Sequence, residues 1–205
     1  MKLLLTISVF LLMLFNQGVR AESILKNFSQ KASSSLLSFS YEFSTKGDLP
    51  LKGKGTALVQ GRNFIIKGEG LEVRCDGSSR WTMDPVAKEA VAESVDETGR
   101  DYMTDPALLL ASMEASFTEL SCSKGRFQGK EADIIVLKPK TASQLKEAEL
   151  YFEKGLPFFA KVTLKDGTIA SFSLKDMKFL EKTDEARFSF DASSLDSSWV
   201  VTDLR

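Results

Sequence analysis

Two cysteines, Cys75 and Cys122, are the only strong nucleophiles that this sequence offers besides its lysines, because the chain contains no histidine. Without histidine there are no Ser–His or Cys–His nucleophile pairs, and the commonest side-chain ligand of transition metals is missing. The sequence also lacks the nucleophile elbow G-x-S-x-G, the P-loop, the motif G-x-G-x-x-G and any cysteine cluster with zinc spacing. We therefore expect no cofactor and no metal.

Acidic residues are plentiful, and they are the remaining candidates for acid–base chemistry. Asp184 and Glu185 are adjacent, but neighbouring residues on a strand point to opposite faces of a sheet. A solvated surface therefore explains these carboxylates better than a paired acid/base site does. The sequence favours a protein that is not an enzyme, and an exported hydrolase that uses a carboxylate or a lysine is a distant alternative.

Residues 1–21 have the pattern of an export signal. Lys2 precedes the apolar stretch Leu3–Phe15, and Val19-Arg20-Ala21 then resembles a cleavage site. A transmembrane anchor is the alternative, but the apolar stretch of 13 residues is shorter than the roughly 20 residues that span a bilayer. We expect cleavage after Ala21 and a soluble, exported protein with one domain, residues 22–205. Its net charge would be −3, which gives no electrostatic footprint for nucleic acid.

Export bears on the two cysteines. An even number of cysteines in an oxidising compartment favours a disulfide between Cys75 and Cys122. In the chain-entropy model, closing a loop of this size stabilises a fold by about 4 kcal/mol. The alternative is two buried thiols that only pack against their neighbours.

The clearest strand in the chain follows an amphipathic helix. Within Glu22–Leu36, apolar residues recur at helical spacing and predict a helix that lies on an apolar surface. Residues 37–44 then alternate strictly between apolar and polar side chains, which predicts a strand with one aromatic face. That face carries Leu37, Phe39, Tyr41 and Phe43, and we expect it to point towards the helices.

A glycine-rich stretch, Gly53–Pro85, predicts an antiparallel meander. Gly61 and Asp76-Gly77 supply the positive φ that tight hairpin turns need. The pair Gly68 and Gly70 suggests a bulge or bend that curls the sheet. The expected strands are Thr56–Val59, Phe64–Ile66, Leu71–Cys75 and Trp81–Met83.

The rest of the chain predicts one more helix and a second set of strands. Asp105 is a good N-cap and Pro106 a good first residue for a helix over Pro106–Phe117, which is more apolar than a solvent-facing helix should be. Residues 141–145 fit either a helical turn or a loop. The expected strands are Ala87–Val95, Phe117–Cys122, Ala132–Leu137, Ala148–Phe152, Phe158–Leu164, Thr168–Leu174, Arg187–Phe190 and, at the edge, 199–202.

Phenylalanine is unusually frequent, with 15 residues in the chain. Phenylalanine routinely fills the cores of β-proteins, so composition alone favours a filled core. Helices laid against a curved sheet allow the alternative of a cavity that holds an apolar ligand.

The ordered motifs G-x-A-x-V-Q-G-x-x-F (from Gly55), D-G-x-x-x-W-x-x-D-P (from Asp76) and D-P-A-L-L-L (from Asp105) resemble the LolA family of periplasmic lipoprotein carriers. The resemblance implies an α+β fold, in which helices cover the concave face of a strongly curved antiparallel sheet, an incomplete barrel, as a lid. It implies that the cavity holds the acyl chains of lipoproteins in transit from the inner to the outer membrane. The cavity residues would be Leu37, Phe39, Tyr41, Phe43, Phe64, Ile66, Leu71, Val73, Trp81, Leu109, Leu110, Met113 and Phe117.

The implied partners are acylated lipoproteins, an inner-membrane export transporter and an outer-membrane acceptor, contacted transiently by a monomeric carrier in the periplasm. The same fold used as a lipoprotein-sensing regulator, or to bind another amphiphile, is the nearest alternative. One departure from the family stands out. The family's better-studied branch carries an Arg-Pro pair whose arginine holds the lid shut, and Gln60-Gly61 occupies that place here, as in a Gln-Gly variant of the family. Glutamine can bond to lid carbonyls but lacks the charge.

Overall fold

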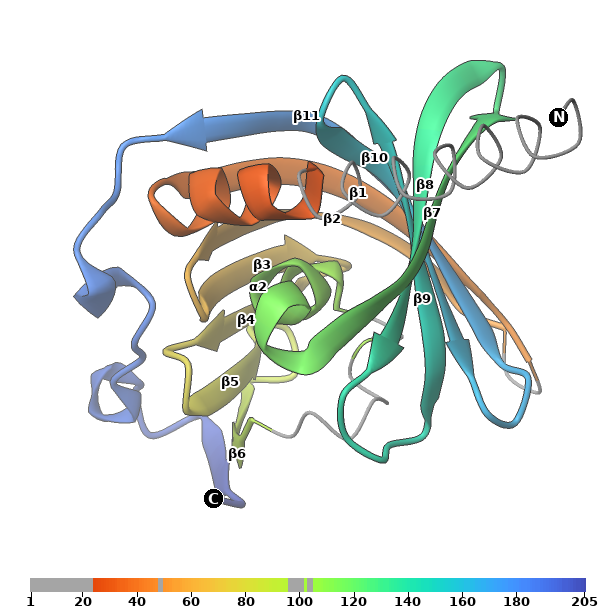
Figure 1. The fold of residues 1–205 in the computed structure, drawn as a ribbon. Helices are drawn as coiled ribbons and strands as arrows, with labels where there is room; N and C mark the ends of the chain where they lie inside the picture. Colours follow the sequence, from red (N-terminus) through yellow and green to blue (C-terminus); the bar gives the residue numbers. More distant parts are fainter. Residues whose placement is uncertain (1–23, 48–49, 96–101, 103–104) are drawn as a thin grey trace, which may run out of the picture.

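A computed structural model of the chain describes residues 24–47, 50–95, 102 and 105–205. The predicted export signal, residues 1–21, lies outside the described residues. Most of the described chain belongs to a single sheet of 12 strands, which curves around two helices (Figure 1). The order of strands across the sheet is β12-β6-β5-β4-β3-β2-β1-β11-β10-β9-β8-β7.

The strands follow the predicted runs closely along most of the chain. The first six form the meander: β1 (Leu36–Lys46), β2 (Lys52–Gln60), β3 (Asn63–Gly68), β4 (Leu71–Cys75), β5 (Ser79–Asp84) and β6 (Glu89–Ser94). The others are β7 (Phe117–Phe127), β8 (Lys130–Pro139), β9 (Leu145–Glu153), β10 (Leu156–Leu164), β11 (Ile169–Leu180) and β12 (Val200–Asp203). Residues 141–144 form a loop.

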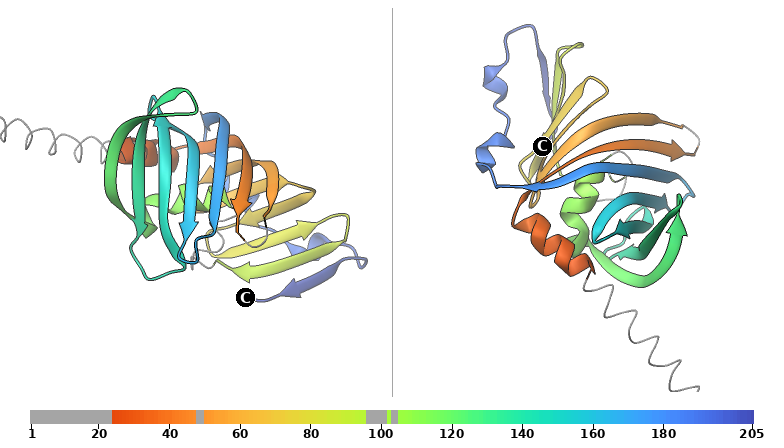
Figure 2. Two further views of the ribbon diagram at one scale, coloured as in Figure 1. Left: turned by 90° about the vertical axis from the view of Figure 1, so that its right-hand side faces the viewer. Right: turned by 90° about the horizontal axis from the view of Figure 1, so that it is seen from above.

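The sheet is an incomplete barrel. Neighbouring strands pair antiparallel throughout, except that β12 runs parallel to β6. The two ends of the strand order, β12 and β7, are both edges of the sheet, so the barrel stays open. Seen from above, the curved sheet wraps around the helices and leaves a gap between its two edges (Figure 2). The predicted fold class, an open and curved sheet with helices on its concave side, is confirmed.

The turn between β3 and β4 differs from the prediction. Glu69 has a φ of 52° and Gly70 a φ of 82°, and the flanking residues Gly68 and Leu71 pair directly across the two strands. Two consecutive residues with positive φ form a tight hairpin turn of the kind whose twist matches its strands. The predicted bulge at Gly68 and Gly70 is therefore wrong, because the second glycine serves a turn.

A bulge does occur where β1 meets β11. Ser40 pairs with Lys175 and Ser38 with Lys178, so two residues of β11 lie opposite a single residue of β1, one more than a regular ladder has. One of these two residues, Asp176, has a φ of 54°, and its Oδ2 accepts a hydrogen bond of 3.2 Å from the Ser40 hydroxyl. This bulge lies in the middle of the strand order, where the meander β1–β6 meets the strands β7–β11. Because bulges increase local twist, it adds to the curvature of the sheet at that point.

The main core lies between the concave face of the sheet and the helices. The predicted face of β1 is confirmed: Leu37, Phe39 and Tyr41 are buried in this core, whereas Glu42 is exposed. The helix over residues 24–33 buries Phe28, whose ring lies 5.8 Å from that of Phe152 on β9, measured between centroids. Its predicted amphipathic character is confirmed.

Helix α2 (Pro106–Ser116) lies inside the curve of the sheet and packs against β2, β3 and β7 (Figure 1). The Asp105 side chain caps it as predicted, since Oδ1 accepts a hydrogen bond of 2.8 Å from the Leu108 amide. All of Pro106–Leu110 is buried, so the first turns are enclosed on every side. The helix stops one residue before the predicted Phe117, which begins β7.

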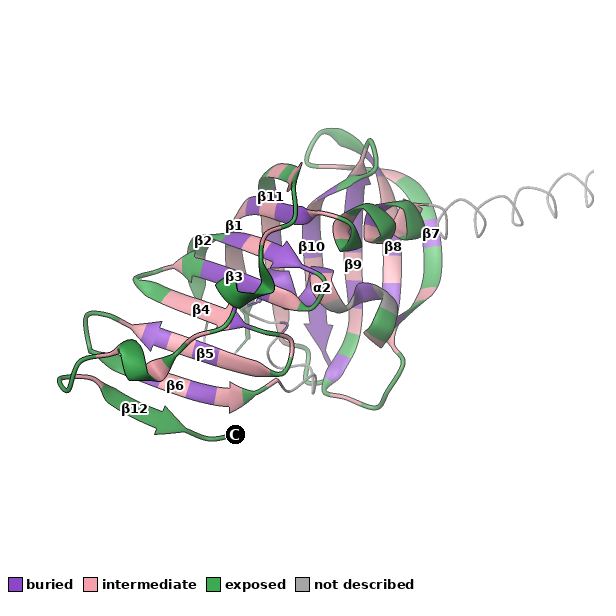
Figure 3. Ribbon diagram, turned by 90° about the vertical axis from the view of Figure 1, so that its left-hand side faces the viewer, coloured by how far each residue is buried: buried purple, intermediate pink, exposed green. Residues whose placement is uncertain are grey.

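The C-terminal segment, residues 181–205, covers the outer, convex face of the sheet over β3–β6 and ends in β12 (Figures 2 and 3). The predicted strand Arg187–Phe190 is wrong, since Glu185–Arg187 forms a short 3₁₀ helix instead. The Asp184 side chain accepts a hydrogen bond of 2.9 Å from the Ala186 amide and so stabilises this turn. The predicted edge strand at 199–202 is confirmed as β12.

Candidate apolar binding site

A cavity of about 350 Å³ opens on the concave face of β1–β5, beside the N-terminus of α2. That volume lies at the lower end of the range of roughly 300–1,000 Å³ found for small-molecule sites. Its apolar walls are Tyr41, Phe43, Ile66, Leu71 and Val73. The polar groups at its rim are Lys54, Glu69, Arg80, Thr82 and Asp105.

Glycines on β2 make room for the aromatic wall. Tyr41 pairs with Gly55 and Phe43 with Gly53 across the two strands. A Cβ atom added to Gly55 would lie 2.9 Å from Tyr41 Oη and 2.6 Å from the Lys67 carbonyl oxygen, both too close for van der Waals contact. Because Gly53 and Gly55 carry no side chains, the rings of Phe43 and Tyr41 can lie over the backbone of β2.

The cavity rim carries charges of both signs. Glu69 Oε1 accepts a hydrogen bond of 3.0 Å from the Lys54 amide, which fixes the β3–β4 turn against β2. Arg80 Nη2 lies 2.9 Å from Glu93 Oε2, so this guanidinium is already paired with a carboxylate of β6. Burial raises the pKa of Tyr41 to about 12, with the carboxylates of Asp105 and Glu69 as smaller causes of the same shift. The Tyr41 hydroxyl therefore keeps its proton at any physiological pH.

A second crevice, of about 460 Å³, runs between the helix at 24–33 and the start of β7. Leu25, Met113, Phe117 and Leu137 give it an apolar floor, and Lys26, Ser29, Glu119 and Lys140 complete its lining. The buried hydroxyl oxygen of Ser29 makes no hydrogen bond in the described part of the chain. A smaller hollow of about 80 Å³, lined by Leu37, Leu110 and Ser29 among others, lies beside the next turn of the same helix.

The structure brings most of the predicted site residues to the concave side, in three places. Tyr41, Phe43, Ile66, Leu71 and Val73 line the cavity of about 350 Å³. Met113 and Phe117 line the crevice beside the helix at 24–33. The others are buried in the main core between sheet and helices, and they are Leu37, Phe39, Phe64, Leu109 and Leu110.

Trp81 lies apart from the other predicted residues. It packs in a separate apolar cluster with Met83, and its ring centroid is 5.2 Å from that of Phe190 on the C-terminal segment. On β5 the residues that face the cavity are its neighbours Arg80 and Thr82. The family resemblance implied that Trp81 lines the cavity, but here both faces of β5 are covered, so an apolar residue can face either way.

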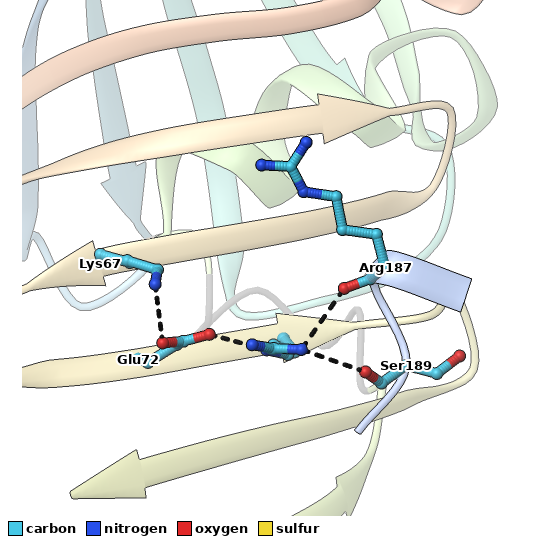
Figure 4. Close-up of polar contacts among 5 residues, drawn as sticks. Lys67, Glu72, Arg187 and Ser189 are labelled. Atoms are coloured by element: carbon cyan, nitrogen blue, oxygen red, sulfur yellow. Dashed lines mark hydrogen bonds and ion pairs between the residues drawn. The ribbon is translucent and has the colours of Figure 1, made fainter. Parts of the chain in front are cut away.

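The same outer face carries an ion-pair network (Figure 4). Glu72 lies 2.9 Å from Lys67 Nζ and 2.7 Å from Arg74 Nε. The Arg74 guanidinium also donates to the carbonyl oxygens of Arg187 and Ser189, at 3.5 Å each. These contacts tie β4 to the C-terminal segment.

The predicted disulfide is not present in the structure. Cys75 on β4 and Cys122 on β7 are both buried thiols. Seven strands separate β4 from β7 in the order of the sheet, so the two side chains come from opposite arms of the open barrel. Burial raises the pKa of Cys75 to about 11, although its sulfur accepts a hydrogen bond of 3.3 Å from the Gly77 amide. Such a thiol is a poor nucleophile at neutral pH.

Sequence reasoning missed the polar rim of the cavity. Arg80 and Thr82 alternate with Trp81, so a face assignment for β5 in the opposite sense would have found them. Glu69 lies in a hairpin turn, where nothing in the sequence indicates contact with a cavity. Within the described residues, no group of three or more histidine, cysteine or acidic residues could hold a metal ion. None of the helices in the described ranges is long and apolar enough to cross a membrane.

Comparison with known proteins agrees with the geometry. The family described as "Outer membrane lipoprotein carrier protein LolA" matches residues 71–191. No curated protein matches the sequence.

Solved structures resemble the fold at low sequence identity. An uncharacterized conserved protein from Thermus thermophilus is 13% identical, with 90% of this chain and 99% of that chain covered and a TM-score of 0.54. A DUF1329 family protein from Desulfovibrio piger is 11% identical, with 86% and 98% covered and a TM-score of 0.51. A LolA superfamily protein, NE2245 from Nitrosomonas europaea, is 12% identical, with 80% and 97% covered and a TM-score of 0.46. From the family match, which spans β4 to the C-terminal segment and so more than half of the sequence, we conclude that this chain belongs to the LolA family.

Proposed function

We propose that this protein is a periplasmic carrier that binds the acyl chains of lipoproteins and transfers them from the inner to the outer membrane, without catalysing a reaction. The observation that carries the proposal is the apolar cavity of about 350 Å³ on the concave face of a LolA-family sheet. A donor transporter in the inner membrane loads the carrier, and an acceptor at the outer membrane unloads it. The carrier works as a monomer.

Apolar walls are well suited to such cargo. Each CH₂ group that moves from water into the cavity contributes about 0.8 kcal/mol, so affinity comes from area and needs no reactive group. An acyl chain enters along Leu71 and Val73, which are partly exposed at the mouth, and lies against Ile66 and the aromatic wall. Binding by area also allows release through a small change of shape.

The helices act as the lid of this carrier. The crevice and the small hollow follow one another along the helix at 24–33, and Ser29, whose hydroxyl is unpartnered, lines both. These gaps mark the contact along which the helix at 24–33 and α2 separate from the sheet. Separation exposes Leu37, Phe39 and Phe64 on the sheet and Leu109, Leu110 and Met113 on α2, which widens the cavity for a longer chain.

The first test is the identity of the cargo. Lipids extracted from the protein, after purification from its native compartment, are analysed by mass spectrometry. Acylated peptides are expected. A different amphiphile as the main bound species would overturn the lipoprotein assignment.

The second test is a substitution in the cavity wall. Val73→Gln places an amide in the apolar site and should weaken the binding of a fluorescent acyl probe by about tenfold or more. Val86→Gln makes the same chemical change at a position that is 88% exposed in the β5–β6 turn, and should leave binding unchanged. Equal binding by both variants would show that the cavity does not hold the chain.

A further inference from the structure

The Tyr41 hydroxyl is a hydrogen-bond donor placed in an otherwise apolar wall. The residue is 5% exposed and lines the cavity of about 350 Å³. Among the residues that the structure describes, none forms a hydrogen bond with Tyr41 Oη. Because Tyr41 Oη faces the cavity, water can reach it when the cavity is empty, and a ligand acceptor can replace that water. A ligand that offers an acceptor at this point gains a hydrogen bond within an apolar wall, and a ligand without one leaves the hydroxyl unsatisfied.

The charges around Tyr41 restrict what that partner can be. Burial is the main cause of the raised pKa of the phenol, and the negative charges of Asp105 and Glu69 add to it, so the hydroxyl stays protonated and donates. The same two carboxylates repel an anionic ligand at this position. The nearest cation on β5, Arg80, is paired with Glu93 at 2.9 Å, and Lys54 is exposed at the rim. A neutral acceptor suits the site better than a carboxylate does.

An acyl chain in ester or amide linkage carries such an acceptor. Its carbonyl oxygen is neutral, and it stands at the end of the hydrocarbon chain, where an apolar cavity wall gives way to a polar rim. We propose that Tyr41 Oη donates a hydrogen bond to the acyl carbonyl, so that the cavity selects acyl esters and amides over free fatty acids and plain hydrocarbons. This inference rests on the proposed function, because it presumes that the cavity holds an acyl chain.

The test uses four pyrene-labelled probes with one chain length: a methyl ester, an N-methyl amide, the free carboxylic acid and the hydrocarbon. The natural protein should bind the ester or the amide more tightly than the acid and the hydrocarbon. Tyr41→Phe removes only the hydroxyl, and should weaken binding of the preferred carbonyl probe about three- to tenfold while leaving hydrocarbon binding unchanged. Comparing ester with amide shows which linkage the site prefers, and so separates an O-acylated lipid from an N-acylated one.

Tyr151→Phe is the matched control. Tyr151 is also buried, at 7% exposed, but it lies on the outer face and donates a hydrogen bond of 2.8 Å to Glu149. Removing the Tyr151 hydroxyl should leave the affinity for all four probes unchanged. If Tyr41→Phe weakens all four probes equally, or none, the carbonyl contact is wrong although acyl binding stands. If the natural protein binds none of the probes, the proposed function itself fails. The preference of the natural protein for the ester or amide over the hydrocarbon tests the inference even without the variant.

Discussion

The side-chain amide of Gln60 pairs with the backbone of Thr183 through two hydrogen bonds. Gln60 Nε2 donates to the Thr183 carbonyl oxygen at 3.0 Å, and Gln60 Oε1 accepts from the Thr183 amide at 2.9 Å. Gln60 is 5% exposed, so both bonds lie in a protected place. The Gln60 side chain thus bonds to both backbone polar groups of Thr183, much as a neighbouring strand would, and holds the start of the C-terminal segment at the end of β2.

This pairing changes the meaning of the Gln-Gly departure from the family pattern. Val59 belongs to the main core on the concave side, and its neighbour Gln60 points to the other face. The Gln60 side chain therefore holds the C-terminal segment on the outer face and makes no latch to α2. The rings of Phe188 and Phe190 pack on that outer face just beyond it.

Gln60→Leu should destabilise the protein and loosen the C-terminal segment. The Thr183 amide and carbonyl would lose their partners, which costs about 1–3 kcal/mol in the free energy of unfolding. Urea denaturation measures the loss, and hydrogen exchange should increase first in residues 181–205. Gln144→Leu, in a loop away from this segment, is the control and should change neither. Altered acyl-probe affinity with no change in stability would instead indicate a latch to the helices.

Substitutions at Leu109 and Met113 test whether each end of α2 packs as part of the core or only loosely against its neighbours. Leu109 is fully buried in α2, so Leu109→Ala should cost about 2–5 kcal/mol in the free energy of unfolding without ligand. Met113 borders the crevice of about 460 Å³, so Met113→Ser should cost less in stability but reduce acyl-probe binding. Chemical denaturation and probe titration of both variants measure these effects. A large stability loss in Met113→Ser with unchanged affinity would make this end of α2 plain core.

Glu72 should contribute to stability at neutral pH but not in acid. Burial raises its pKa, but hydrogen bonds from Lys67 and Arg74 outweigh that effect, and the net pKa is lowered from 4.5. A carboxyl whose pKa is lower in the folded state stabilises the fold fully above the unfolded value, and the contribution disappears as the pH falls through the folded value.

The Glu72→Gln variant tests this dependence. It should lose less than about 1 kcal/mol at pH 7, because Lys67 is exposed, and should show a shallower fall in stability as the pH drops from about 5 to about 3. Urea denaturation over that range measures the slope. Glu181→Gln, at an exposed position just after β11, should keep the slope of the natural protein. Unchanged slopes in both variants would remove Glu72 from the acid response.

The two cysteines should both react once the protein is unfolded without reductant. Thiol labelling in denaturant is expected to modify Cys75 and Cys122, since the structure contains no disulfide between them. In the folded protein at about pH 8, Cys75 should react very slowly, because a pKa of about 11 leaves roughly one thiolate in a thousand. Its rate should increase as the pH is raised towards that value. Absence of any labelling in denaturant would show that the bond does form.

Local physics made several parts of the fold predictable. The alternation over residues 37–44 determined which side of β1 is buried, because a half-buried strand allows only one assignment. Asp105 and Pro106 defined the start of α2, since capping depends on residues within one turn. The turns at Gly61 and Gly77 followed from the positive φ that glycine adopts without strain.

The candidate site depended on contacts that no local pattern contains. Trp81 faces outwards because a segment far along the chain supplies Phe190 as its partner. The predicted Cys75–Cys122 bond failed because the sheet places their strands in opposite arms. The polar rim around Tyr41 combines β2, β5, a hairpin turn and the cap of α2. The sequence by itself determined the elements and their buried stripes, because those depend on neighbours along the chain. Only the tertiary structure decided which apolar stripe lines a cavity and which packs against another segment. The reason is that an apolar residue gives the same sequence pattern whether a cavity, a helix or a distant segment covers it.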